Sequence, residues 1–329
     1  MRLMQLFLAV IVAFVPGAAG AAGKPTRLTV MSFNTWGLGK LAGQPVEKVA
    51  EAIKAAGADI VGIEETRVES PPEGTPAEPV PEFGYGDSHA AELGNALGWN
   101  IVDQIPQKST FKAAGIWSSA VASRFPITGK TKNQLGVFLN VDGRRIAIFN
   151  VHFNDSPYQP YQVLNIPYGE FPFIKTEAEA IKFAKEARGE GLALLLEDLK
   201  EAADAEAVFV TGDFNEPSWR DWTAKAVAAG QQPVKVGFPT AKAIEAAGFT
   251  DALRVAFPDE VAKPAFTWTP TTDPASKDDH HDRIDFVFAR APNLKVISAA
   301  IIGEKKPEAD VVVTPWPSDH RAVAATIEF

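Results

Sequence analysis

The chain has 329 residues, of which 46% are hydrophobic, and it carries a formal net charge of −9 with no cysteine. Such a composition can bury a large core, so we expect a globular protein of one large domain or two ordinary ones. The acidic balance disfavours a protein that wraps long nucleic acid, and it suits a site that binds Mg²⁺ or Ca²⁺ through carboxylates. The absence of cysteine excludes disulfides and thiolate metal sites.

Residues 1–22 have the pattern of a secretory signal peptide. Arg2 supplies the positive charge, residues 6–15 form a short apolar run, and small residues follow at 17–23. Because about ten apolar residues are too few to span a bilayer as a helix, we expect cleavage and no membrane anchor. The mature protein is then a single domain of residues 23–329, periplasmic or secreted.

Two predicted strands near the start of the mature chain end in polar residues. Residues 27–33 lead to Asn34, and residues 59–63 lead to Glu64 and Glu65. Neighbouring side chains on a strand point to opposite faces, so one carboxylate can enter a site while the other faces away. A solvated loop with a surface ion pair to Arg67 is the alternative.

A hairpin follows further along the chain. Asp-Gly at 142–143 separates two strand-like runs, 135–141 and 145–151, and this dipeptide is typical of a tight hairpin turn. The second run delivers His152 and Asn154 to a strand end. Residues 69–85, which lie between the strand that ends at Glu65 and this hairpin, are rich in proline and are expected to form a loop.

The middle of the chain holds an aromatic segment and a second polar motif. Residues 155–173 are predicted to form a loop that either lines a pocket or packs on the surface. A helix is predicted over 177–203 with a break near Gly189 and Gly191. The strand that ends at Gly212 then presents Asp213 and Asn215 on one side of the backbone, although an Asx turn would explain the same residues.

Later segments again place polar residues at the ends of predicted strands. A helix is predicted to start near Trp219, with Ser218 as its candidate cap, and a strand over 283–288 carries Asp285. Within the titratable run 278–282, His280, His281 and Asp282 are interpreted either as a solvated loop, or as a rim contact or a second cation site. The strand ends together carry these polar residues: Asn34, Glu65, His152, Asn154, Asp213, Asn215, Asp285, Asp319 and His320.

Those residue types fit one kind of chemistry. Carboxylate and carboxamide oxygens are the ligands that Mg²⁺ and Mn²⁺ prefer. Histidines beside carboxylates suit acid–base work or the stabilisation of negative charge. Together they favour hydrolysis of a phosphoester by water.

In chain order the motifs resemble the endonuclease/exonuclease/phosphatase superfamily, which includes deoxyribonucleases, apurinic-site endonucleases, neutral sphingomyelinases and inositol polyphosphate 5-phosphatases. The resemblance covers about residues 27–329 and implies an α+β fold, a four-layer α/β/β/α sandwich with two mixed sheets packed face to face and helices outside. The motifs that carry it are Ser32–Trp36, Ile63–Thr66, Ser123–Ile127, Asn150–His152, Gly212–Asn215, Arg283–Phe286 and Ser318–His320.

The resemblance also implies roles. By this resemblance, Asp213 orients or deprotonates the attacking water. His320 contacts the scissile phosphate, with support from Asp285 or Asp319. His152 stabilises the leaving side of the substrate. Glu64 stands where many members have Gln and is expected to lie outside the metal shell. The remaining implied assignments are metal binding by Asn34, Glu65 and Asp319, phosphate contact by Asn215, and substrate binding by Asn154 and Arg124.

The substrate is harder to predict. A nuclease needs basic side chains along the nucleic-acid backbone, and the motifs offer few: Arg67, Lys108, Lys112, Arg124, Arg220 and Arg283. We therefore expect a monomeric, Mg²⁺- or Mn²⁺-dependent hydrolase of a small or lipid-derived phosphoester. A secreted metal-dependent DNA or RNA endonuclease is the alternative, and a catalytically silent binding module is disfavoured because no motif position is lost.

Overall fold

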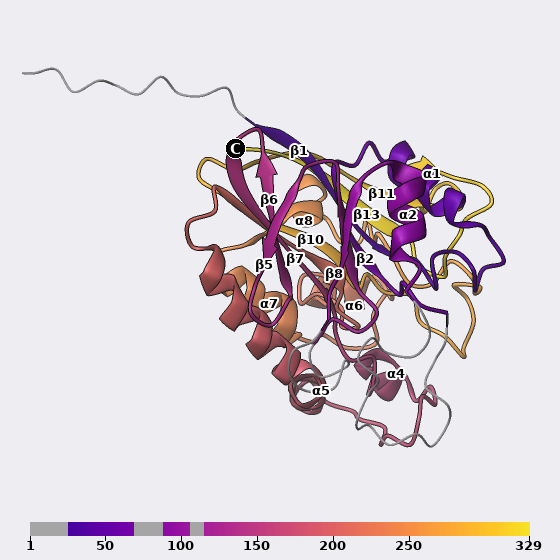
Figure 1. Cartoon of the computed structure of the whole chain (residues 1–329). Coiled ribbons are helices and arrows are strands. Elements are labelled where there is room, and N and C mark those ends of the chain that lie inside the picture. The colour runs from indigo at the N-terminus through magenta and orange to yellow at the C-terminus, as the bar shows by residue number, and fades with distance from the viewer. Residues whose placement is uncertain (1–25, 69–87, 106–114) are drawn as a thin grey trace, which may run out of the picture.

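The computed structural model describes residues 26–68, 88–105 and 115–329. They form two mixed β-sheets packed face to face with helices on the outer surfaces (Figure 1). The predicted signal peptide and the predicted loop at 69–85 lie outside the described residues. The predicted four-layer sandwich is confirmed.

The first sheet has seven strands in the order β12-β11-β13-β1-β2-β4-β3. Its centre pairs β1 parallel to β2 and antiparallel to β13. The strands are β1 Arg27–Asn34, β2 Ile60–Glu64, β3 Asn100–Asp103, β4 Ala120–Ser123, β11 Lys295–Gly303, β12 Val311–Val312 and β13 Ala322–Glu328.

The second sheet has six strands in the order β5-β6-β7-β8-β10-β9. Here β7 runs parallel to β8, and β10 runs antiparallel to β8. The predicted Asp142-Gly143 turn joins β6 to β7, and both of its residues have positive φ. The strands are β5 Ile127–Lys130, β6 Gly136–Val141, β7 Arg144–His152, β8 Ala207–Asp213, β9 Thr250–Asp251 and β10 Asp285–Arg290.

Three apolar clusters hold the layers together. Side chains such as Val30 and Phe209 fill the space between the sheets. The outer face of the first sheet packs on α1 and α2, and that of the second on α5 and α7. Burial of apolar surface at about 25 cal/mol per Å² drives this stacking. The helices are α1 Val46–Ala55, α2 Ala90–Leu97, α4 Gln159–Leu164, α5 Glu177–Asp198, α6 Ala224–Ala228, α7 Pro239–Ala246 and α8 Ala252–Ala256.

Three local predictions are wrong. Helix α5 continues through Gly189 and Gly191, because its Thr176 capping box and its buried face outweigh the low helix propensity of two glycines. Helix α6 begins at Ala224 under a Thr223 cap instead of near Trp219. The segment 155–173 contains helix α4 where a loop was expected.

A polar contact joins the sheets directly beneath the site. Asn150 donates to the carbonyl of Ile63 and accepts from the Thr211 hydroxyl, so β7 and β8 are tied to β2. A Cβ on Gly62 would lie only 2.1 Å from the Asn150 and Thr211 oxygens. Glycine at 62 therefore lets the two sheets approach at this point.

Within the described ranges, no helix combines the length and the apolar character that a membrane span needs.

Candidate active site

The polar motifs meet at one edge of the sandwich because of strand direction. In the parallel pair β1/β2, Asn34 lies opposite Glu64, and in the parallel pair β7/β8, His152 lies opposite Asp213. Strand β10 is antiparallel and begins at Asp285, opposite Asp213. Carboxyl ends of four strands from two sheets thus present their polar residues to one cavity.

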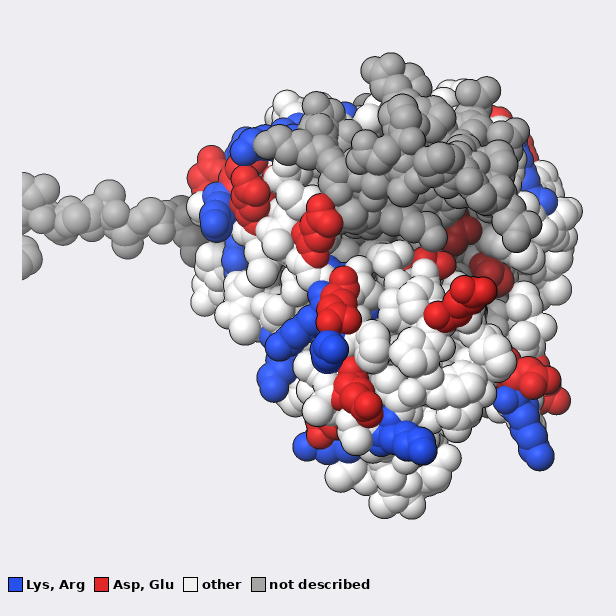
Figure 2. Space-filling model, turned by 90° about the horizontal axis from the view of Figure 1, so that it is seen from below, with Lys and Arg blue, Asp and Glu red and all other residues white. Residues whose placement is uncertain are grey.

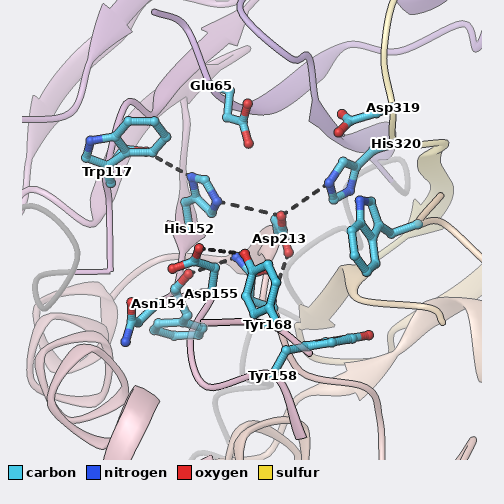
Figure 3. Close-up of a pocket in the computed structure, with 13 residues that line it drawn as sticks. Glu65, Trp117, His152, Asn154, Asp155, Tyr158, Tyr168, Asp213, Asp319 and His320 are labelled. Atoms are coloured by element: carbon cyan, nitrogen blue, oxygen red, sulfur yellow. Dashed lines mark hydrogen bonds and ion pairs between the residues drawn. The ribbon is translucent and has the colours of Figure 1, made fainter. Parts of the chain in front are cut away.

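Asp213 lies at the centre of this group (Figure 3). Its Oδ2 is 3.6 Å from Nε2 of His152 and 3.7 Å from Nε2 of His320. The Asn34 amide donates to the same oxygen at 3.0 Å, and Asp213 Oδ1 accepts from the backbone N–H of Asn215 at 2.8 Å. The Asx turn is therefore present, and Asp213 and Asn215 both line the cavity.

His320 is held by Asp285 and not by Asp319. Its Nδ1 lies 3.0 Å from Oδ2 of Asp285, in a pair that is almost wholly buried. Burial alone would lower the pKa of His320, but the charges of Asp285 and Asp213 outweigh it and raise this pKa well above its usual value. The two carboxylates thus favour the charged form of His320, which is the form that suits contact with an anion.

His152 differs from His320 in the partner of its Nδ1 atom, which is a backbone carbonyl and not a carboxylate. Its Nδ1 lies 3.0 Å from the carbonyl of Trp117, which can only accept a hydrogen bond. Nδ1 must therefore carry the proton, and Nε2 is directed at the cavity beside Asp213 (Figure 3).

Several buried carboxylate oxygens in this region lack a hydrogen-bond partner among the described residues. One is Oδ1 of Asp319, and burial raises the pKa of Asp319 to about 6 against the opposing charge of His320. Potential ligand atoms of Asp213, Asp285 and His320 also lie within 4.8 Å of one another. A divalent cation would neutralise these clustered carboxylate oxygens, which are the ligands that such cations prefer.

The individual donors differ in how well they suit that cation. Carboxylate oxygens are better donors for a hard divalent cation than an imidazole nitrogen is. Glu65 lines the cavity, and its Oε1 accepts from the Asn34 amide at 3.0 Å. The amide nitrogen of Asn34 donates to Glu65 and Asp213. To bind a cation through its oxygen, as predicted, the carboxamide would have to turn.

Glu64 does not line the cavity. It is fully buried, and neither side-chain oxygen has a hydrogen-bond partner among the described residues. Burial, reinforced by the charges of Asp285 and Asp213, raises the pKa of Glu64 well above its usual value.

The cavity has a volume of about 410 Å³ and an aromatic wall that the sequence predicted only in part. Trp117 packs on the ring of His152, and Trp268 lies beside His320. The predicted aromatic segment contributes Tyr158 and Tyr168, so its pocket alternative is confirmed for these two side chains. The lining residues are Glu65, Trp117, His152, Phe153, Asn154, Asp155, Tyr158, Tyr168, Asp213, Asn215, Trp268, Asp319 and His320.

The prediction that Arg124 binds substrate is wrong. Arg124 follows β4 at the end where Ser123 pairs with Ile60, opposite to the end that bears Glu64. Its guanidinium pairs with Asp59 at 2.9 Å. Asn154, in contrast, lines the cavity, with its amide donating to the carbonyl of Ser156.

In the run 278–282, His281 and Asp282 are buried, and none of the five residues lines the cavity. Asp282 is 1% exposed and accepts from the Tyr158 hydroxyl at 2.9 Å and from the Trp222 indole at 2.8 Å. The hydrogen bond to Asp282 holds Tyr158, a residue of the aromatic wall, in place.

We expect Asp282 to make stability depend on pH. Burial raises the pKa of Asp282 to about 8, far above that of an unfolded aspartate. Between these values the folded protein holds a proton that the unfolded chain has lost, so the free energy of unfolding falls as pH rises, by up to about 1.4 kcal/mol per pH unit. Urea unfolding at pH 5 to 8 should show a shallower slope for Asp282→Asn. Equal slopes in both proteins would contradict this assignment.

Comparison with known proteins agrees with the geometry. The model of the "Endonuclease/Exonuclease/phosphatase family" matches residues 31–320. "Uncharacterized protein F14F9.5" of Caenorhabditis elegans is 32% identical over 130 residues, which span 37% of this chain and only 41% of that protein.

Solved structures show the same fold. An endonuclease/exonuclease/phosphatase from Beutenbergia cavernae aligns over 92% of this chain and 72% of its own, with a TM-score of 0.52 and 18% identity. An AP endonuclease from Archaeoglobus fulgidus aligns over 91% and 98%, with a TM-score of 0.50 and 16% identity. Because the family model also matches nearly the whole described chain, the chain belongs to the endonuclease/exonuclease/phosphatase family.

Proposed function

We propose that the chain hydrolyses phosphoesters of small molecules or lipid head groups, with Mg²⁺ or Mn²⁺ as its cation and Ca²⁺ as a further candidate. The observation that carries this proposal is the 410 Å³ cavity that joins Asp213 and His320 to an aromatic wall. Cavities of about 300–1,000 Å³ are typical of small-molecule sites.

The residues divide the work of hydrolysis as follows. Asp213 accepts the proton of the attacking water, and the His320 imidazolium stabilises charge on the phosphate oxygens. Asp285 keeps His320 charged and oriented. Nε2 of His152 faces the leaving group, while Asn215 and Asn154 contact the phosphate or its substituent.

Glu65 and Asp319 would hold the cation, with Asn34 beside them. When bound, the cation would neutralise phosphate charge and acidify a water molecule. The unpartnered Asp319 oxygen and the crowding of carboxylates support this assignment.

The charge distribution supports a small substrate over long nucleic acid. Arg220 pairs with Glu245, and Arg283 is buried between Asp221 and Asp251. The Arg283 guanidinium is therefore not available for a phosphate backbone, and that of Arg220 already has a carboxylate partner. On the face in Figure 2, Lys and Arg are dispersed among acidic side chains and form no continuous basic patch over the described part of that face. Export of the mature protein, predicted from residues 1–22, is part of the same proposal.

A panel of substrates tests the proposal. We expect kcat/KM for bis(p-nitrophenyl) phosphate or a phospholipid diester to exceed that for a DNA oligonucleotide by about tenfold or more, a difference worth about 1.4 kcal/mol in transition-state binding. Activity should require Mg²⁺ or Mn²⁺ and stop in EDTA. Nicking of supercoiled plasmid at a higher kcat/KM than any small ester would favour the nuclease.

A further inference from the structure

Arg188 is a buried arginine of helix α5 that lies behind the cavity without lining it. It is 1% exposed. Its guanidinium donates to Oε1 of Gln159 at 2.6 Å, to the carbonyl of Pro157 at 3.2 Å, and to the carbonyl of Asn215. One side chain therefore connects two loops that are distant in sequence.

Both of those loops carry cavity residues. The loop after β7 supplies Asn154 and Tyr158, and the loop after β8 supplies Asn215. The two loops also contact each other, because the Asn215 amide donates to the carbonyl of Phe153 at 3.0 Å. The guanidinium thus fixes the relative position of two sides of the cavity.

The bond to the Asn215 carbonyl bears on the reaction centre. Asn215 has a φ of +48°, a left-handed conformation that costs a non-glycine residue energy. Its backbone N–H donates to Asp213 Oδ1 while its carbonyl accepts from Arg188. A rotation of this residue would move the N–H that orients the Asp213 carboxylate.

Arginine is suited to this position in a way that lysine is not. Its planar guanidinium presents several donors in fixed directions, whereas an ammonium is a point charge on a flexible stem. The charge is offset by Glu216, whose Oε2 lies 3.9 Å away and which accepts from the backbone and hydroxyl of Thr240.

We propose that Arg188 is a positioning residue for the hydrolytic reaction: it holds the Asn215 peptide, and through it Asp213, in register with the loop that carries Tyr158. This inference rests on the proposed function, because it assigns Arg188 a role in the reaction at that site.

The test compares Arg188→Lys with Arg254→Lys. Arg254 is a matched control, since it is also buried, pairs with Asp221, and donates to the carbonyls of Phe257, Lys263 and Pro264, none of which lines the cavity. For Arg188→Lys we expect kcat to fall by about 10- to 100-fold with KM within about threefold, because small misplacements of reacting groups have effects of that size. For Arg254→Lys both constants should stay within about threefold while the urea midpoint falls.

A second variant covers failure of Arg188→Lys to fold. The double variant Arg188→Gln, Glu216→Gln removes both charges together, so no unpaired buried charge remains. It should lose kcat, whereas the control Arg254→Lys should not.

Hydrogen exchange separates this inference from the proposed function. Amides of residues 153–159 and 213–217 should exchange faster in Arg188→Lys than in the wild type and Arg254→Lys. Unchanged exchange and unchanged kcat in a folded Arg188→Lys protein would overturn the positioning role. A wild type that hydrolyses no phosphoester, but whose two loops exchange faster in the variant, would overturn the proposed function and keep only the structural link.

Discussion

Replacement of Asp213 by asparagine is expected to lower kcat by about 10³-fold or more, since loss of a general base typically costs about 10²- to 10⁴-fold and Asp213 also balances two histidines. Its Oδ2 lies within 3.7 Å of Nε2 of both His152 and His320. Asparagine keeps the shape of the side chain but cannot accept the proton of water. The measurement is kcat for bis(p-nitrophenyl) phosphate at saturating Mn²⁺.

The control for this prediction is Asp198→Asn. Asp198 is equally buried but lies away from the cavity, where it accepts from Thr131 and Asn133 and from the backbone of Leu135. We expect this variant to lower the urea midpoint and to keep kcat within about threefold, because its changes are to stability alone. Turnover by Asp213→Asn at more than about a tenth of the wild-type rate would exclude Asp213 as the base.

The sequence was sufficient to predict the polar half of the site. Strand ends are readable because an apolar run stops at a polar residue, as at Asn34 and Asp213. Parallel pairing then brings the carboxyl ends of neighbouring strands to one edge, which the registers of β1/β2 and β7/β8 confirm. The order of the motifs along the chain indicated the family, and the family implied the fold.

The aromatic half could not be predicted in the same way. Trp117 and Trp268 lie in short segments whose pattern would equally suit core packing, and only the tertiary fold turns them toward the cavity. Arg124 shows the converse error, because a residue adjacent to a strand motif can lie at the far end of that strand. Direction along the strand, not proximity in sequence, determines membership of the site.

Removal of the Glu65 charge is the second large effect that we expect. Glu65 has a φ of +56° and lines the cavity immediately after β2, in a left-handed conformation that turns its carboxylate away from the line of the strand. Glu65→Gln keeps the acceptor for Asn34 but removes the negative charge. We expect cation affinity, measured by calorimetry with Mn²⁺, to fall by about 10-fold or more, and kcat/KM at low Mn²⁺ to fall by about 10²-fold, in line with electrostatic losses at other charged sites.

The adjacent residue provides the control. Glu64→Gln makes the same chemical change one position earlier, but Glu64 is fully buried and does not line the cavity, and burial raises the pKa of its carboxyl well above the usual value. Its carboxyl and the glutamine amide have nearly the same shape, so we expect Mn²⁺ affinity and kcat/KM within about threefold of the wild type, the usual range for a substitution that preserves volume away from a binding site. If Glu64→Gln lost the cation and Glu65→Gln kept it, the metal site would lie beneath the cavity floor, between the two sheets. The contrast between two neighbouring carboxylates thus locates the cation on one face of β2.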